Sequence, residues 1–141
     1  MSSLVNFRVL LKNELMIRGL HLTQWLNANR ISANLMQIHS KPKSLILYVK
    51  VSNSNPGFWG LTANQLKTIR GSNLDSYVVL LTKASDQGYL LSMKDVDNRI
   101  ENGTLELSGD GDHKVNEKSD LTPEMKFKGI ADFVSRILNE K

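Results

Sequence analysis

Lys50 is the residue whose surroundings in the sequence most clearly suggest chemistry, because it is a cation inside an apolar run. It belongs to LILYVKV at residues 45–51, where alternate side chains are aliphatic and the other set includes Tyr48 and Lys50. Such alternation predicts a β-strand and places Tyr48 and Lys50 on one face. A lysine held there can contact a phosphate, or its aliphatic stem can extend from a sheet edge to water.

The sequence around Lys50 contains few groups that could hold a metal ion. Between Glu14 and Asp75 it has no aspartate or glutamate. A hydrolytic magnesium site uses one or two carboxylates together with substrate phosphates. The amide of Asn34 is a weak ligand, and the phenol of Tyr48 stays protonated at neutral pH. We therefore expect no bound metal and no other cofactor.

The same region is rich in cations. Residues 1–70 carry nine lysines or arginines and one carboxylate, whereas residues 71–141 carry nine and thirteen. Such a cationic region suits a polyanion, because lysine and arginine near phosphates release condensed counterions. We predict nucleic acid, with DNA as the first candidate, bound through Arg30, Lys41, Lys43, Lys50, Lys67 and Arg70. The alternative is that these residues are ordinary solvated surface charges.

Trp59 adds a second type of contact. It lies in the turn Phe58-Trp59-Gly60, close in sequence to the cations. An aromatic side chain in such a loop can stack on a base. The alternative is that it packs beneath the following helix and fixes the entry of that helix into the fold.

Hydrophobic spacing indicates the elements that position these residues. Spacings of three and four predict a helix over residues 3–18, ended by Gly19. Residues 20–26 form a short strand or a second helical turn, with Thr23 and Trp25 favouring the strand. Strands follow at 31–39 and 45–51, and the short connection between them predicts an antiparallel hairpin. A helix over 62–70 has Thr62 as its expected N-cap, with Gln65 in capping-box position.

The second half of the chain shows the same alternation of elements. Strands are predicted at 74–82 and 89–93, the first of them covered on both faces, with a short helix at 94–100. A small strand at 104–107 precedes a surface loop or irregular hairpin at 109–124. An amphipathic helix at 126–138 ends the chain.

This order of elements resembles the core of the PD-(D/E)XK nuclease superfamily, in its Holliday-junction-resolvase branch. The resemblance covers residues 5–96. It implies an α/β domain of the restriction-endonuclease-like type, with a central mixed sheet flanked by helices in α-β-β-β-α-β-β order. A peripheral loop and C-terminal helix at 97–141 would complete a single domain over residues 1–141.

The resemblance also implies a set of site positions. In that family a glutamate of the first helix, a strand aspartate and an E-x-K motif gather around magnesium. Here Glu14 and Lys50 match two of these positions, while Asn34 and Tyr48 stand where carboxylates are expected. We therefore expect all four residues in one cleft with a degenerate site. The resemblance further implies a homodimer.

Three functions follow from these observations. The first is a catalytically degenerate nuclease-like domain that binds nucleic acid without sequence preference. The second is an active magnesium-dependent endodeoxyribonuclease that uses Glu14, Asp75 and Lys50, with Asn34 as a neutral ligand. The third is a structural subunit that docks a protein partner through an apolar sheet edge or its final helix.

The sequence also bears on the compartment. It has no cysteine, no basic segment before an apolar leader, and no apolar run near the ~20 residues that cross a bilayer. We expect a cytoplasmic protein without membrane contact.

Overall fold

The computed structural model describes residues 3–27, 30–41, 44–84 and 86–139, with the side chains of residues 26–33 left undescribed. Its helices are α1 (Ser3–Ile17), α2 (Ala63–Arg70), α3 (Met93–Glu101), α4 (Glu117–Asp120) and α5 (Ile130–Ile137), with a 3-10 turn at Pro123–Met125. Its strands are β1 (His21–Asn27), β2 (Arg30–His39), β3 (Leu45–Val51), β4 (Phe58–Thr62), β5 (Asp75–Leu81), β6 (Gln87–Ser92), β7 (Asp112–Asn116) and β8 (Lys126–Lys128).

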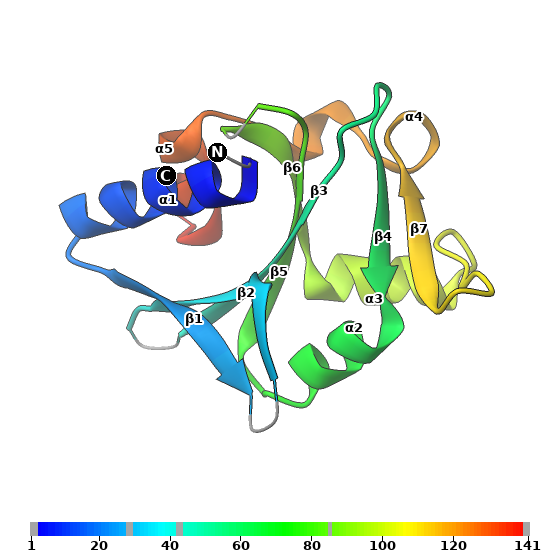
Figure 1. Cartoon of the computed structure of the whole chain (residues 1–141), viewed down its shortest axis with the longest axis horizontal. Coiled ribbons are helices and arrows are strands. Elements are labelled where there is room, and N and C mark those ends of the chain that lie inside the picture. Colours follow the sequence, from blue (N-terminus) through cyan, green and yellow to red (C-terminus); the bar gives the residue numbers. More distant parts are fainter. Residues whose placement is uncertain (1–2, 28–29, 42–43, 85, 140–141) are drawn as a thin grey trace.

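Six of these strands form a central sheet in the order β1-β2-β3-β5-β6-β8 (Figure 1). β3 and β5 run parallel, and the other neighbouring pairs are antiparallel. The predicted hairpin of β2 and β3 is therefore confirmed. β4 and β7 form a separate two-stranded ribbon. The expected α/β architecture with a mixed sheet flanked by helices is confirmed.

The two faces of the sheet carry separate hydrophobic cores. On the side that we call the α1 face, α1 and α5 pack through Phe7, Leu11 and Phe133. On the opposite side, the α2 face, the core includes Trp59 from the ribbon and residues of α2 and α3. β5 alternates between the two cores, with Val78 and Leu80 on the α2 face and Val79 and Leu81 on the α1 face. This confirms that the strand is covered on both sides.

Two strands, β4 and β7, lie where the sequence predicts a turn and a surface loop or irregular hairpin. They pair with each other, from Phe58 opposite Asn116 to Thr62 opposite Asp112. Their inward side chains, such as Leu61 and Val115, are buried in the α2-face core. Each strand is only five residues long and its partner lies far along the chain. The local pattern is therefore too short to reveal the pairing.

Two local predictions are wrong. The last helix begins at Ile130 rather than at residue 126, because Gly129 has φ 91°, which a helix does not accept. Residues 104–107 form no strand, and Leu107 makes only an isolated bridge to His113. The predicted N-cap of α2 at Thr62 is confirmed, although its side chain makes no capping hydrogen bond.

The end of the chain belongs to the core rather than to the periphery. β8 pairs with β6 at the edge of the main sheet. Phe133, Val134 and Ile137 of α5 are buried on the α1 face. Across the described residues, no helix is both long and apolar enough to cross a membrane.

Candidate nucleic-acid interface

Tyr48 lies in the α2-face core and not in an open cleft. It is directly opposite Leu35 in the β2–β3 register, and its side chain is 0% exposed. Its Oη accepts a hydrogen bond from the backbone N–H of Thr62 at 3.1 Å. Burial raises the pKa of Tyr48 above its ordinary value. This phenol is a neutral structural group that joins β3 to the end of β4.

Lys50 follows Tyr48 on the same face of β3, as the alternation predicts. It is opposite Leu80 in the parallel register with β5 and is half-buried. Its amine forms no hydrogen bond or ion pair with a described residue. The lysine is therefore placed at the end of a buried strand, where its stem packs and its amine has no protein partner among the described residues.

Asn34 lies on the other face of the sheet, so the prediction of one shared cleft is wrong. Because Leu35 is opposite Tyr48, the register continued by one step places Asn34 opposite Val49. The Asn34 Nδ2 donates to the Val49 carbonyl oxygen at 2.6 Å. A change of one residue in register moves a side chain to the opposite face, and a short turn alone does not determine that register.

Glu14 does not approach the sheet site either. It forms an ion pair with Arg18 on the same helix. Arg18 Nη2 in turn donates to Ser135 Oγ of α5 at 3.4 Å. Glu14 therefore lies on the flank of α1 that faces α5. Its predicted role as the carboxylate entering from the first helix is wrong.

Asp75 is far from Lys50, which excludes the set proposed for an active nuclease. Asp75 is opposite Leu45, and Lys50 is opposite Leu80, so five strand steps, or about 16 Å, separate the two positions. Asp75 instead lines a 650 Å³ pocket that also contains Arg70, Lys94 and Asp97. Among the described residues, no three His, Cys, Asp or Glu side chains form a group that could hold a metal ion.

Trp59 is buried, so its predicted role in base stacking is wrong. Its side chain is 2% exposed, and its Nε1 donates to the Leu81 carbonyl oxygen at 2.9 Å. Its ring meets that of Tyr89 edge to face, with centroids 6.1 Å apart. The neighbouring Phe58 is exposed, and Lys114 Nζ lies 5.8 Å from its ring centroid. Trp59 thus attaches the ribbon to the sheet.

The predicted cations do not form one patch. Lys67 and Arg70 lie on α2 and are exposed, and Arg70 Nε donates to Asp97 Oδ1 at 2.7 Å. Lys41 is exposed at the connection between β2 and β3. Lys43 and the side chain of Arg30 lie outside the described residues.

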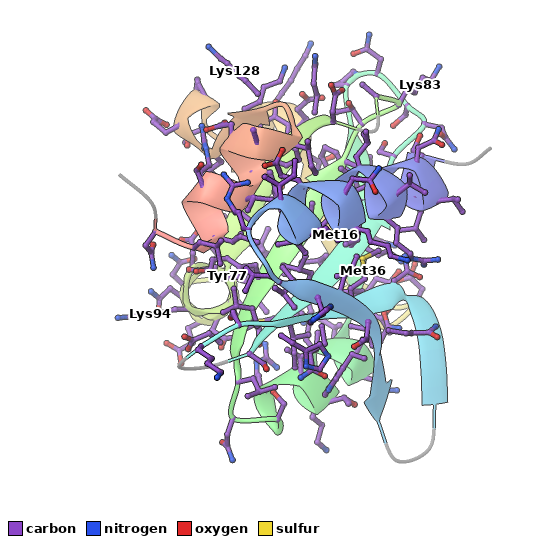
Figure 2. All side chains as sticks on the ribbon, turned by 90° about the vertical axis from the view of Figure 1, so that its left-hand side faces the viewer. Met16, Met36, Tyr77, Lys83, Lys94 and Lys128 are labelled. Atoms are coloured by element: carbon purple, nitrogen blue, oxygen red, sulfur yellow. The ribbon has the colours of Figure 1, made fainter. Side chains whose placement is uncertain are left out.

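A second group of cations, absent from the predicted set, lies on α1. Arg8 and Lys12 line a groove of 170 Å³ against β1 and β2. The other lining residues are Leu22, Thr23, Gln24, Leu35 and Met36. Figure 2 looks onto α1 and the β1–β2 hairpin, with Met36 between them. The sequence indicated this pair by its spacing: Arg8 and Lys12 are four residues apart on a predicted helix, which places both side chains on one flank.

Comparison with known proteins bears on the fold. No family model and no curated protein matches the chain. Among solved structures, it is similar to Archaeoglobus fulgidus Hjc, a Holliday junction resolvase from an archaeal hyperthermophile. The TM-score is 0.56 at 17% sequence identity, over 92% of this chain and 98% of that one. This likeness, together with the strand order described above, shows that the chain has the same nuclease-like fold as that structure.

Proposed function

We propose that this chain is a nucleic-acid-binding domain built on a nuclease-like fold whose metal site is degenerate. The observation that carries the proposal is the environment of Tyr48. The position two residues before the motif lysine, where the family has a carboxylate, holds a buried phenol that accepts a hydrogen bond from the Thr62 N–H. A carboxylate needs water, a metal or a charged partner, and this site is closed by Leu35 and the end of β4.

Binding is supported by the cations that surround the fold. Lys12, Lys41 and Lys67 are exposed, and the net charge is +4. Lysine and arginine contacts to phosphate orient a protein on nucleic acid without reading its bases. A solved structure with the same fold is that of a Holliday junction resolvase. DNA is therefore the first ligand to test, and duplex, branched DNA and RNA should be compared.

Fluorescence anisotropy at increasing salt tests the binding directly. For three to five phosphate contacts, log K should fall with log salt at a slope of roughly −3 to −4 on duplex DNA. Scrambling the sequence of the duplex should leave the affinity unchanged. Absence of binding to DNA and RNA at low salt would reject the proposal and leave the cations as solvated surface charges.

The degenerate site is tested by incubating linear and four-way DNA with the protein and Mg²⁺ or Mn²⁺. We expect no cleavage above that of a Lys50→Ala variant purified in the same way. Cleavage by the wild type that disappears in Lys50→Ala would instead restore the endonuclease alternative.

A docking function is the second candidate, through α1 and not through the final helix. The apolar stripe of α5 is buried, whereas α1 exposes several large apolar side chains: Val5, Val9, Leu10, Met16 and Ile17. An exposed apolar surface of this kind is typical of a protein interface, and a homodimer is one form that it can take. Light scattering after size exclusion, over a range of protein concentrations, would show whether a dimer forms.

A further inference from the structure

We infer that the groove between α1 and the β1–β2 hairpin, lined by Arg8 and Lys12, holds the sugar-phosphate backbone of a nucleic-acid strand. This inference rests on the proposed function and adds to it a particular surface and type of contact. It moves the main contact from the predicted cations at β3 and α2 to the opposite face of the sheet.

The spacing of the two cations suits phosphates that are about two steps apart on one strand. Arg8 and Lys12 are four residues apart on α1 and therefore about 6 Å apart along its axis. Phosphates of one strand recur about every 3.4 Å along a duplex axis. The pair therefore spans about two phosphate steps of one strand.

The rest of the groove matches the other parts of a backbone. Gln24 brings an amide, a group that commonly binds phosphate oxygens, whereas the Thr23 hydroxyl lies 2.8 Å from His39 Nε2. The half-buried Leu22 adds apolar surface against which a sugar can pack, whereas Leu35 and Met36 are almost fully buried. At 170 Å³ the groove is smaller than the roughly 300–1,000 Å³ of pockets that enclose small molecules. It therefore suits a segment of chain lying along it better than an enclosed free nucleotide.

The charge of the groove favours an anion. None of the described residues that line the groove is a carboxylate. Lys12 is exposed and has no hydrogen bond or ion pair with a described residue. Glu14, the nearest carboxylate along the helix, is about 200° around the helix axis from Lys12 and is paired with Arg18.

The larger pocket beside α3 differs in this respect. Its cations Arg70 and Lys94 are accompanied by Asp75 and Asp97, and Arg70 is bound to Asp97 at 2.6 Å. Opposite charges in equal number give little net attraction for a phosphate. Lys94 is exposed and lies on α3, on the α2 face, which makes it a matched control for Lys12.

The test compares Lys12→Ala with Lys94→Ala in anisotropy titrations of the full chain against labelled single-stranded DNA, duplex DNA and RNA. Lys12→Ala should weaken binding about three- to tenfold and lower the duplex salt slope by about one, equally for unrelated sequences. Lys12→Glu should weaken it further. Lys94→Ala should leave both quantities unchanged.

A measurement on the unmodified protein gives an independent readout. In ¹⁵N-labelled wild type, addition of the same DNA should shift the amide signals of residues 8–12 and 22–24 and leave those of α3 in place. If the wild type binds but Lys12→Ala equals Lys94→Ala and these signals do not move, the groove is rejected and the proposed function stands. If the wild type binds no nucleic acid, both are rejected.

Discussion

At the scale of single residues, Tyr48 is the position where the family resemblance implies a carboxylate and the structure places a buried phenol. Its ring is enclosed in the α2-face core, and its hydroxyl accepts the backbone N–H of Thr62. That N–H belongs to the residue before α2, whose own side chain makes no capping bond. The phenol thus performs a structural task at the place where the family resemblance implies a metal ligand.

Tyr48→Phe should therefore lower the free energy of unfolding by about 1 to 2 kcal/mol, because the Thr62 N–H loses its buried acceptor. Tyr77→Phe is the matched control, since Tyr77 is half-buried in the next strand and its hydroxyl has no partner among the described residues. That change should stay within about 0.5 kcal/mol. Urea unfolding of both variants measures the difference, and equal losses would contradict the structural role of the Tyr48 hydroxyl.

At the scale of elements, α1 carries large apolar side chains on its solvent-exposed side as well as on the side that faces the core. Phe7, Leu11 and Leu15 are buried against the sheet and α5, while Met16 and Ile17 are largely exposed. This distribution explains why the hydrophobic spacing predicts the helix but does not identify which apolar residues form the core. The contacts with α5 and the sheet decide that.

Substitutions at two nearby positions should distinguish the buried side of α1 from its exposed side by their effect on stability. Leu15→Ala should cost about 2 to 5 kcal/mol, because Leu15 is 0% exposed and its removal leaves a cavity. Ile17→Ala should cost less than about 0.5 kcal/mol, because Ile17 is 80% exposed. Thermal and urea unfolding give both values. A large loss in Ile17→Ala would show that this side chain is covered in solution, as a dimer through α1 requires.

Glu117 connects three elements that are distant in sequence. Its Oε2 accepts from Tyr89 Oη of β6 at 2.5 Å, and its Oε1 accepts from the Gly57 N–H before β4 at 2.6 Å. The hydrogen bond from Tyr89 has the largest effect and that from Gly57 the second largest, and both hold the pKa of Glu117 below its usual 4.5. Burial, with a contribution from Glu117, raises the pKa of Tyr89 from 10.0 to about 12.

These shifts predict losses of stability at both ends of the pH range. The lowered pKa of Glu117 gives stability that is present above pH 4.5 and is lost as pH falls through the folded-state pKa. The raised pKa of Tyr89 gives stability that is present below pH 10 and is lost as pH rises towards 12. The stability difference between wild type and Glu117→Gln should thus shrink in acid, and that between wild type and Tyr89→Phe should shrink in alkali.

Urea unfolding across this pH range provides the measurement. Glu106→Gln, at an exposed position, controls for the change in net charge. Differences that stay constant with pH would show that the contacts of Glu117 do not depend on its charge.

At the scale of the whole molecule, the charge asymmetry of the sequence is distributed over both faces of the sheet. Arg8 and Lys12 lie on α1, whereas Lys67 and Arg70 lie on α2 across the sheet. One nucleic-acid strand cannot contact all of them directly. The groove on the α1 side has two cations and no carboxylate among the described residues that line it.

Removal of divalent metal should therefore not weaken binding. If lysine and arginine make the phosphate contacts, the affinity for duplex DNA in EDTA should be at least as high as that in Mg²⁺ at matched ionic strength, because Mg²⁺ competes with these side chains for the phosphates. Anisotropy titrations in the two buffers test this. A requirement for Mg²⁺ would indicate that carboxylates bind the DNA through a metal ion.

Much of the fold was predictable because its signals are local. Apolar periodicity and turn residues located α1, the hairpin of β2 and β3, α2, β5 and β6 within a few residues. The ribbon of β4 and β7 was missed, because each strand is five residues long and its partner is more than forty residues away. Its stability comes from pairing and from packing on the sheet, which a sequence window does not contain.

For the site, the sequence by itself determined the composition: a strand with Tyr48 and Lys50, no carboxylate from residue 15 to 74, and a cationic first half. The tertiary structure alone decided which side chains meet. The β2–β3 register placed Asn34 on the face opposite Lys50, and the packing of α1 directed Glu14 towards α5 and Lys12 towards β1. A one-residue change in register or a rotation of a helix reverses such placements and changes the local conformational energy of the strand or helix very little. Contacts between distant elements therefore determine them.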